Sequence, residues 1–291
     1  MTSPIYASLH TKSFADDGLA ITTVESWARQ KVNLVRQYLT AFVAAVENQV
    51  DEMVFVDLYA KNGLCCLGAR DDIFAGIPLM ALSQPLPIHK YVFCESDAEQ
   101  FRDLKIRINR YFKQKNTVLL EGKPADLQEK LKLYVPAWRK SHRVAVFCVA
   151  DSFLPEPDLS LVRHLGDHGF SFLIPLTFHL NATLDFRFYL HQEASKLKHF
   201  AGEDDLQKVL GKNMSSNRQF YKRLTRWYEE QVRAHGMQTA VAHHKMDSGL
   251  MEMPSYAMFL LSALYPAKTI QAEALASGIH QFNLFNTSPH A

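Results

Sequence analysis

Residues 53–63 read Met-Val-Phe-Val-Asp-Leu-Tyr-Ala-Lys-Asn-Gly, an apolar run that ends in an acid and continues into a turn containing glycine. An unbroken apolar run is typical of a strand buried on both faces, as in a parallel sheet. Similar runs follow at 91–94, 117–120, 144–149 and 170–178, and helical patterns separate them. This alternation predicts an α/β fold with a doubly wound, mostly parallel sheet.

The predicted helices begin before the first strand. Residues 23–46 carry apolar side chains at helical spacing, so we expect an N-terminal helix there, after an arm over 1–22. Shorter helices are expected between the strands, at 76–82, 98–112, 126–133 and 158–165.

The C-terminal part of the chain departs from this alternation. Residues 184–235 predict a helical insertion that ends in a long amphipathic helix. Apolar runs follow at 237–243 and 256–264, and periodicity leaves open whether the second is a strand or a helix. Two strands would form an antiparallel pair at the sheet edge. We therefore expect one domain over 23–277 and a tail over 278–291.

The composition is that of an ordinary globular protein. Of 291 residues, 47% are hydrophobic and 21% are charged, which excludes a disordered, collagen-like or coiled-coil chain. The formal net charge of +2 gives no argument for nucleic-acid binding. The four cysteines and 13 histidines show no metal-ligand spacing, so no metal site is expected. Since neither a secretory signal nor a membrane-spanning run is recognisable, we expect a cytoplasmic location.

Acidic residues follow three of the predicted strands where each strand ends. They are Asp57, Glu95 and Asp151. In open α/β sheets, ligands bind outside the carboxyl ends of the strands, near the switch in strand order. With Gly63 in the first turn, these acids suit a nucleoside-containing cofactor, whose ribose hydroxyls would donate to Glu95. The alternative is structural: Asp57 and Glu95 would cap helices, and Asp151 would be a turn residue.

Several motifs follow one another along the chain: Trp27, Lys31 and Tyr38, then Val56-Asp57-Leu58-Tyr59-Ala60 with Gly63, Gly76-Ile77-Pro78-Leu79 with Leu82, Tyr91-Val92-Phe93-Cys94-Glu95, Asp151, and Tyr256-Ala257-Met258-Phe259-Leu260. Their order is similar to that in the three-Cys-motif partner proteins (TcmP), whose fold resembles that of class I S-adenosylmethionine-dependent methyltransferases. The chain resembles this family over residues 23–274. The resemblance implies a Rossmann-like methyltransferase fold and association with a three-Cys-motif protein.

The resemblance also implies a binding site for S-adenosylmethionine. Its pocket would be formed by Asp57, Tyr59, Lys61 and Gly63, with Glu95 on the ribose. Asp151 and Phe153 would take the catalytic positions after the fourth strand. In related methyltransferases the polar residue there accepts a hydrogen bond from a target amine, and the aromatic ring stacks on the base or carrier of that amine. Methyl transfer is a direct displacement, so positioning and desolvation matter more than an acid or a base.

Three loops depart from the family pattern. Lys61 stands where the family has a glycine, and it would either clamp the carboxylate of the cofactor or obstruct its pocket. Lys123 stands where the family has an acid that helps to hold the adenine, and this contact would be lost unless Asp126 replaces the acid from the next turn. Ser152 stands where the family has a proline after the acid.

These departures leave more than one function open. The first is a methyltransferase that uses S-adenosylmethionine and acts on nucleic acid or another macromolecule. The second is a catalytically silent relative, a pseudoenzyme that acts as a binding or assembly partner. A third is a nucleotide or phosphate binder that uses the two loop lysines.

Two basic stretches are candidates to contact a macromolecular substrate. One covers residues 102–115. The other lies on the long helix of the insertion, where Arg218, Lys222, Arg226 and Trp227 would bind substrate. The cations would hold a phosphate backbone, and the aromatic rings would stack on bases. The alternative for both stretches is a solvated helix face that packs on the core through its aromatic side chains.

Overall fold

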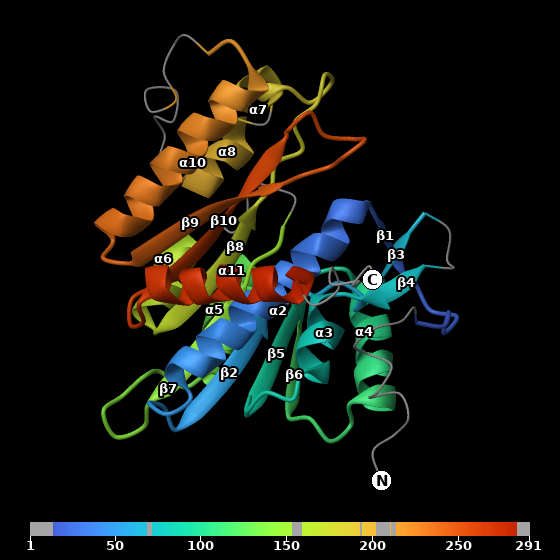
Figure 1. Ribbon diagram of the computed structural model, residues 1–291, viewed down its shortest axis with the longest axis vertical. Helices are drawn as coiled ribbons and strands as arrows, with labels where there is room; N and C mark the ends of the chain where they lie inside the picture. The colour runs from blue at the N-terminus through green and yellow to red at the C-terminus, as the bar shows by residue number, and fades with distance from the viewer. Residues whose placement is uncertain are drawn as a thin grey trace, which may run out of the picture.

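The computed structural model describes residues 14–68, 72–152, 159–192, 194–201, 210 and 214–283. At its centre is a seven-stranded sheet with the order β6-β5-β2-β7-β8-β10-β9 (Figure 1). Its strands are β2 (Glu52–Asp57), β5 (Lys90–Glu95), β6 (Thr117–Glu121), β7 (Val144–Val149), β8 (Phe170–Leu176), β9 (Gln238–Lys245) and β10 (Ser255–Ser262). The first five pair in parallel, and β10 is antiparallel to both β8 and β9. The mostly parallel sheet and the C-terminal antiparallel pair are both confirmed.

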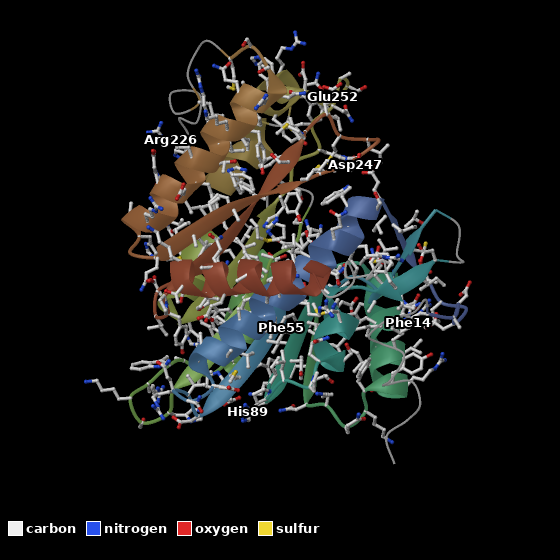
Figure 2. All side chains as sticks on the ribbon, in the orientation of Figure 1. Phe14, Phe55, His89, Arg226, Asp247 and Glu252 are labelled. Carbon is white, nitrogen blue, oxygen red and sulfur yellow. The ribbon has the colours of Figure 1, made fainter. Side chains whose placement is uncertain are left out.

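The interior strands of the sheet are apolar on both faces. Every residue of β7 is buried, and so is every residue of β2 after the first. Phe55 of β2 lies at the centre, with its ring centroid 6.2 Å from that of Phe93 and 6.3 Å from that of Phe147 (Figure 2). A strand without alternation needs cover on both sides, which is why its continuous apolar run predicts a parallel sheet between helices.

Helices cover both faces (Figure 1). On one face α2 (Ser26–Val46) packs against α3 (Ile77–Ser83) and α11 (Ala267–Asn283); on the other, α6 (Leu159–Asp167) packs against α8 (Ala194–Ala201) and α10 (Asn217–Ala234). The remaining elements are α4 (Ala98–Tyr111), the short 3-10 helix η1 (Pro124–Leu127), α5 (Gln128–Tyr134) and α7 (Phe186–His191). None of the helices in the described ranges has the length and apolarity that a bilayer crossing requires.

Two parts of the structure differ from the sequence prediction. A small second sheet, with the order β1-β3-β4, is formed by β1 (Thr22–Val24), β3 (Leu64–Leu67) and β4 (Ile73–Ala75). Its strands are too short to give a periodic signal, and β1 pairs with a strand from a distant part of the sequence. At the other end of the chain, α11 continues past residue 278, where the tail was expected to begin.

Candidate functional site

Three acidic residues meet at one edge of the central sheet. Asp57 ends β2, Glu95 ends β5, and Asp151 follows β7. Because β2 pairs in parallel with both β5 and β7, the carboxyl ends of these strands are neighbours. All three side chains are buried. The tertiary structure thus brings together the three acids that the sequence singles out as ligand-binding candidates.

Asp57 has one satisfied carboxylate oxygen and one unsatisfied one. Its Oδ1 accepts a hydrogen bond from the backbone N–H of Tyr59 at 3.0 Å, whereas Oδ2 is buried and has no partner among the described residues. Burial, reinforced by the nearby carboxylates of Asp151 and Glu95, raises the pKa of Asp57 to about 7, against the hydrogen bond from Tyr59. Asp57 is therefore a carboxyl group that changes its charge near neutral pH.

Glu95 holds the loop that follows β2. Its Oε2 accepts from the backbone N–H of Lys61 at 2.7 Å, and its Oε1 accepts from that of Asp97 at 2.8 Å. Lys61 reaches this position with a φ of 53°, in the left-handed region that glycine adopts without strain. Each carboxylate oxygen has a second lone pair, so Glu95 can still accept two more hydrogen bonds.

Gly63 ends this loop at a position that excludes any side chain. Its φ is +87°, and a Cβ atom there would lie 2.9 Å from Cγ of Leu79 and 3.0 Å from Cδ1 of Leu104. The carbonyl of Gly63 also accepts a hydrogen bond from the backbone N–H of Gly76 at 2.8 Å. The loop therefore packs directly against α3 and α4, and this contact fixes the acids at the edge of the sheet.

A buried lysine completes the acid cluster. Lys31 of α2 places its Nζ 2.6 Å from Oδ1 of Asp151 and 4.8 Å from the ring centroid of Trp27. Burial lowers the pKa of Lys31, while the charge of Asp151 opposes this shift. Lys31 belongs to the motif order that carries the family resemblance, yet sequence reasoning assigned it no role at the site. The only signal is a lysine on an otherwise apolar helix face.

An internal arginine ties the N-terminal arm to the same loop. Arg107 is fully buried, and its Nε and Nη2 donate to the two oxygens of Asp17 at 2.8 and 2.7 Å. Its Nη1 donates to the carbonyl oxygens of Asn62 at 2.7 Å and Ala20 at 2.9 Å. The sequence predicts that Arg107 belongs to an exposed basic stretch, and this prediction is wrong because the side chain is fully buried. Arg107 connects the N-terminal arm to the loop after β2, because it donates to Asp17 and Ala20 of the arm and to Asn62 of the loop.

The proposed substrate-binding residues lie elsewhere. Arg218, Lys222 and Arg226 of α10 line a cavity of about 820 Å³ beside β9. Trp227 is buried, 4% exposed, and its ring packs 6.5 Å from that of Phe200, so it belongs to the core. Strand β9 is four strands from β2, which corresponds to about 19 Å at the usual spacing of strands.

Two predicted site residues, Tyr59 and Phe153, remain to be placed. Tyr59 contributes its backbone N–H to Asp57, and its side chain is half-buried. Phe153, the proposed aromatic partner of Asp151, lies outside the described residues. Within the described ranges, no group of three or more His, Cys, Asp or Glu side chains is arranged to hold a metal ion.

The strand order and the acid-lined edge define the class of fold. Five parallel strands, with an antiparallel strand inserted before the edge strand, and a cluster of acids where β2 and β5 end, make a Rossmann-like, class I methyltransferase-like domain. The chain matches no protein-family model and no curated protein.

Solved structures with this fold resemble the chain at low sequence identity. Protein LPL1258 from Legionella pneumophila has a TM-score of 0.51 at 11% identity, and the match covers 88% of this chain and 94% of that protein. This similarity supports the fold alone.

Two proteins whose names state their activity are structurally more distant. WbdD, a bifunctional kinase-methyltransferase, has a TM-score of 0.45 at 9% identity, and the match covers 81% of this chain. The small RNA methyltransferase HEN1 has a TM-score of 0.42 at 11% identity, with 79% of this chain covered. The chain spans 40% of WbdD and 25% of HEN1.

Proposed function

We propose that this protein binds S-adenosylmethionine at the acid-lined edge of the sheet and transfers its methyl group to a macromolecular substrate. One observation carries the proposal: Asp57 Oδ2 is buried without a partner among the described residues, close to Glu95. A buried polar atom without a partner costs free energy, and a ligand that donates a hydrogen bond removes this cost. The amino group and ribose hydroxyls of S-adenosylmethionine are donors of the required kind.

Different residues at this edge would bind different groups of the cofactor. Glu95 would accept hydrogen bonds from the ribose hydroxyls through its remaining lone pairs, and Asp57 would accept one from the amino group. Lys61, on the same loop, would pair with the cofactor carboxylate. The bound cofactor supplies a methyl group on a positively charged sulfur, which passes to the nucleophile of the substrate and leaves S-adenosylhomocysteine.

Asp151 would position the nucleophile. Its Oδ1 is occupied by Lys31 at 2.6 Å, whereas its Oδ2 makes no hydrogen bond to any described residue. A target amine would donate to this second oxygen, and Lys31 would hold the carboxylate in the orientation that presents it. Because the displacement is direct, this alignment is the main contribution that the chain makes to the rate.

Calorimetric titration of the purified protein with S-adenosylmethionine and S-adenosylhomocysteine tests the proposal. We expect binding at micromolar strength, weakened by tenfold or more in Glu95→Gln and in Asp57→Ala. Glu121→Gln is the matched control, because Glu121 ends the neighbouring strand β6 with its side chain exposed. If millimolar cofactor gives neither heat nor thermal stabilisation, the methyltransferase function is wrong.

A second candidate function is a catalytically silent binding or assembly subunit. The observation that favours it is the hydrogen bond from Lys61 N–H to Glu95, which satisfies one oxygen of the acid without a ligand. Replacing Lys61 by glycine separates the two functions. Cofactor binding that appears only in Lys61→Gly would indicate a decayed enzyme, whereas binding that this variant loses would indicate that Lys61 clamps the cofactor.

We also propose kinship with the three-Cys-motif partner proteins and association with a three-Cys-motif protein. The motif residues that suggest this kinship are distant in sequence, yet they form a chain of contacts: Lys31 pairs with Asp151 and lies over the ring of Trp27. The ring centroid of Trp27 is in turn 5.6 Å from that of Tyr256. Such contacts support their action as one unit. Size-exclusion chromatography of the chain co-expressed with a three-Cys-motif protein should give a stable complex, and separate elution would contradict the association.

A further inference from the structure

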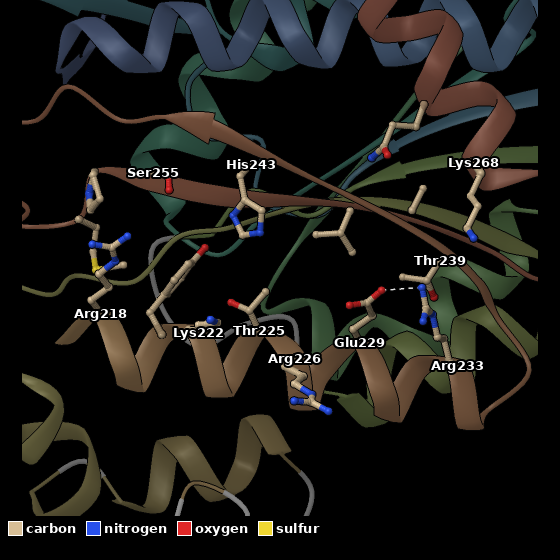
Figure 3. A pocket seen from close by; sticks show the side chains of 16 residues that line it. Arg218, Lys222, Thr225, Arg226, Glu229, Arg233, Thr239, His243, Ser255 and Lys268 are labelled. Carbon is tan, nitrogen blue, oxygen red and sulfur yellow. Dashed lines mark ion pairs between the residues drawn. The ribbon is translucent and has the colours of Figure 1, made fainter. Parts of the chain in front are cut away.

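The cavity beside β9 is a second candidate site, separate from the acid-lined edge. It lies between α10 and the edge strand β9 (Figure 3). Arg218 and Lys222 lie on α10, His243 on β9 faces them, and Lys268 comes from α11. We propose that this cavity, named here the basic groove, binds a single nucleic-acid strand through its phosphates. If the proposed function holds, that strand is the methyl-accepting substrate.

The basic groove carries an excess of positive charge. It is lined by five cationic side chains and one carboxylate, Glu229; the cations are Arg218, Lys222, Arg226, Arg233 and Lys268. Glu229 pairs with Arg233 at 2.6 Å, and Arg226 pairs with Glu230 at 2.9 Å. Among the described residues, Arg218, Lys222 and Lys268 have no carboxylate partner. Their charge is therefore available to an external anion.

The cations form a row rather than a point. Arg218, Lys222 and Arg226 follow one another at intervals of four residues, which places them on one side of α10 about 6 Å apart along the axis. Arg233, which is paired with Glu229, lies about 23 Å from Arg218 along the same helix, and Lys268 lies toward the Arg233 end of the groove (Figure 3). The cations without a carboxylate partner among the described residues, Arg218 and Lys222 at one end and Lys268 toward the other, are therefore spread over more than one phosphate group can engage. This spread matches a polymer that carries one negative charge in every repeat, as a nucleic-acid strand does.

Tyr221 lines the groove, but the aromatic side chains of α10 offer no exposed ring face there for stacking. Trp227 and Tyr228 are buried in the core, and Tyr221 is 5% exposed. The hydroxyl of Tyr221 donates to the carbonyl of Leu176 at 2.6 Å and accepts from the N–H of Ala257 at 2.7 Å. Bases therefore find no ring of this helix to stack on, and the groove contacts the backbone. We expect weak sequence preference and strong dependence on salt.

One end of the groove reaches the edge of the sheet at which the acid cluster lies. Ser255 begins β10 and lines the cavity, and the neighbouring Ala257 pairs with Leu176 at the carboxyl end of β8. A strand leaving the groove there would have about 19 Å to cross before it reaches the end of β2. This distance allows the groove to anchor an extended substrate but not to hold the reacting group itself.

Fluorescence anisotropy with a labelled 20-nucleotide single strand of mixed sequence tests the inference. The charge-reversing variant Arg218→Glu/Lys222→Glu is compared with Lys105→Glu/Lys113→Glu, which reverses two exposed lysines on or just after α4. We expect the groove variant to bind at least tenfold more weakly, and its dependence of log K on log salt to be shallower by about 1.4, since each lost phosphate contact removes about 0.7 for a single strand. The α4 variant should change affinity by less than twofold.

Each other outcome overturns a defined part of the inference. Equal loss in both variants would show that the groove is not the site, and preference for the duplex form of the oligonucleotide would overturn the single-strand assignment. Displacement by polyglutamate as effective as displacement by unlabelled oligonucleotide would show selection for charge alone. Thermal melting verifies folding of both variants. Titration with S-adenosylmethionine keeps the two proposals apart, because nucleic-acid binding without cofactor binding would leave the groove standing and remove the methyltransferase function.

Discussion

Lys31 Nζ lies 2.6 Å from Asp151 Oδ1, and the two side chains are 3% and 9% exposed. The pair joins helix α2 to the end of β7, across 120 residues of sequence. A buried ion pair is seldom the most stable choice for a core, because both charges lose their hydration. The pair lies at the carboxyl end of a parallel strand, the position at which open α/β sheets generally bind ligands. This position agrees with the role proposed for Asp151, a carboxylate held in a fixed orientation.

Breaking this pair should destabilise the protein strongly. We expect Lys31→Met to lower the free energy of unfolding by about 3–5 kcal/mol, because Asp151 remains buried without its counter-charge. The double variant Lys31→Met/Asp151→Leu should recover most of this loss. Urea unfolding measures both. The exposed pair of Arg143 and Asp51 is the control, and Arg143→Met should cost far less. If Lys31→Met and Arg143→Met lower the free energy of unfolding equally, the cost of breaking the Lys31 pair does not come from its burial.

The raised pKa of Asp57 makes stability depend on pH. The unfolded carboxyl titrates near 3.8 and the folded one near 7, so the folded state binds the proton more tightly. Stability is therefore highest below pH 4 for this group and falls as the pH rises toward 7, by about 4 kcal/mol in total. In Asp57→Asn this fall should be absent. Urea unfolding of the wild-type protein and Asp57→Asn from pH 4 to 8 measures this difference. If the free energies of unfolding of the two proteins change with pH in the same way, Asp57 is not the group responsible.

Gly63→Ala tests the packing of the loop that follows β2, for which we propose cofactor binding. We expect a loss of several kcal/mol, about 1 from the positive φ and more from contact with Leu79, together with loss of cofactor binding. Gly18→Ala provides a matched control, since Gly18 has a φ of +78° and a Cβ atom added there would meet nothing within 4 Å. The difference in melting temperature between the two variants separates the cost of the positive φ, which both share, from the cost of contact with Leu79, which only Gly63→Ala has. Similar losses would show that collision with Leu79 is unimportant.

Arg107 is expected to hold the N-terminal arm in place. Arg107→Met leaves Asp17 partly buried without its partner and frees the carbonyl of Asn62, so we expect a loss of about 3–5 kcal/mol and faster proteolysis of residues 14–24. Arg107→Lys should rescue little, because an ammonium cannot replace the paired donors of a guanidinium. Limited proteolysis followed by mass spectrometry measures the release of the arm. An arm that stays protected in both variants would contradict this role.

The sequence alone determined the central sheet and the acids at its edge. In a parallel sheet covered on both faces, continuous apolar runs mark the strands, and the residue after each run lies at the ligand-binding edge. Asp57, Glu95 and Asp151 could therefore be placed near one another without any knowledge of packing. The signal is local, because strand and turn are contiguous in the chain.

Only the tertiary structure decided what these acids contact. Lys31 meets Asp151 across 120 residues, and Arg107 meets Asp17 across 90, so no periodicity or spacing joins them. The same applies to the basic groove, where Lys268 of α11 joins the cations of α10 over an edge strand. Burial also separated the side chains of α10, placing Trp227 in the core and Arg218 in the groove. Local sequence determines the backbone pattern, whereas the pairing of charges depends on which distant elements pack together.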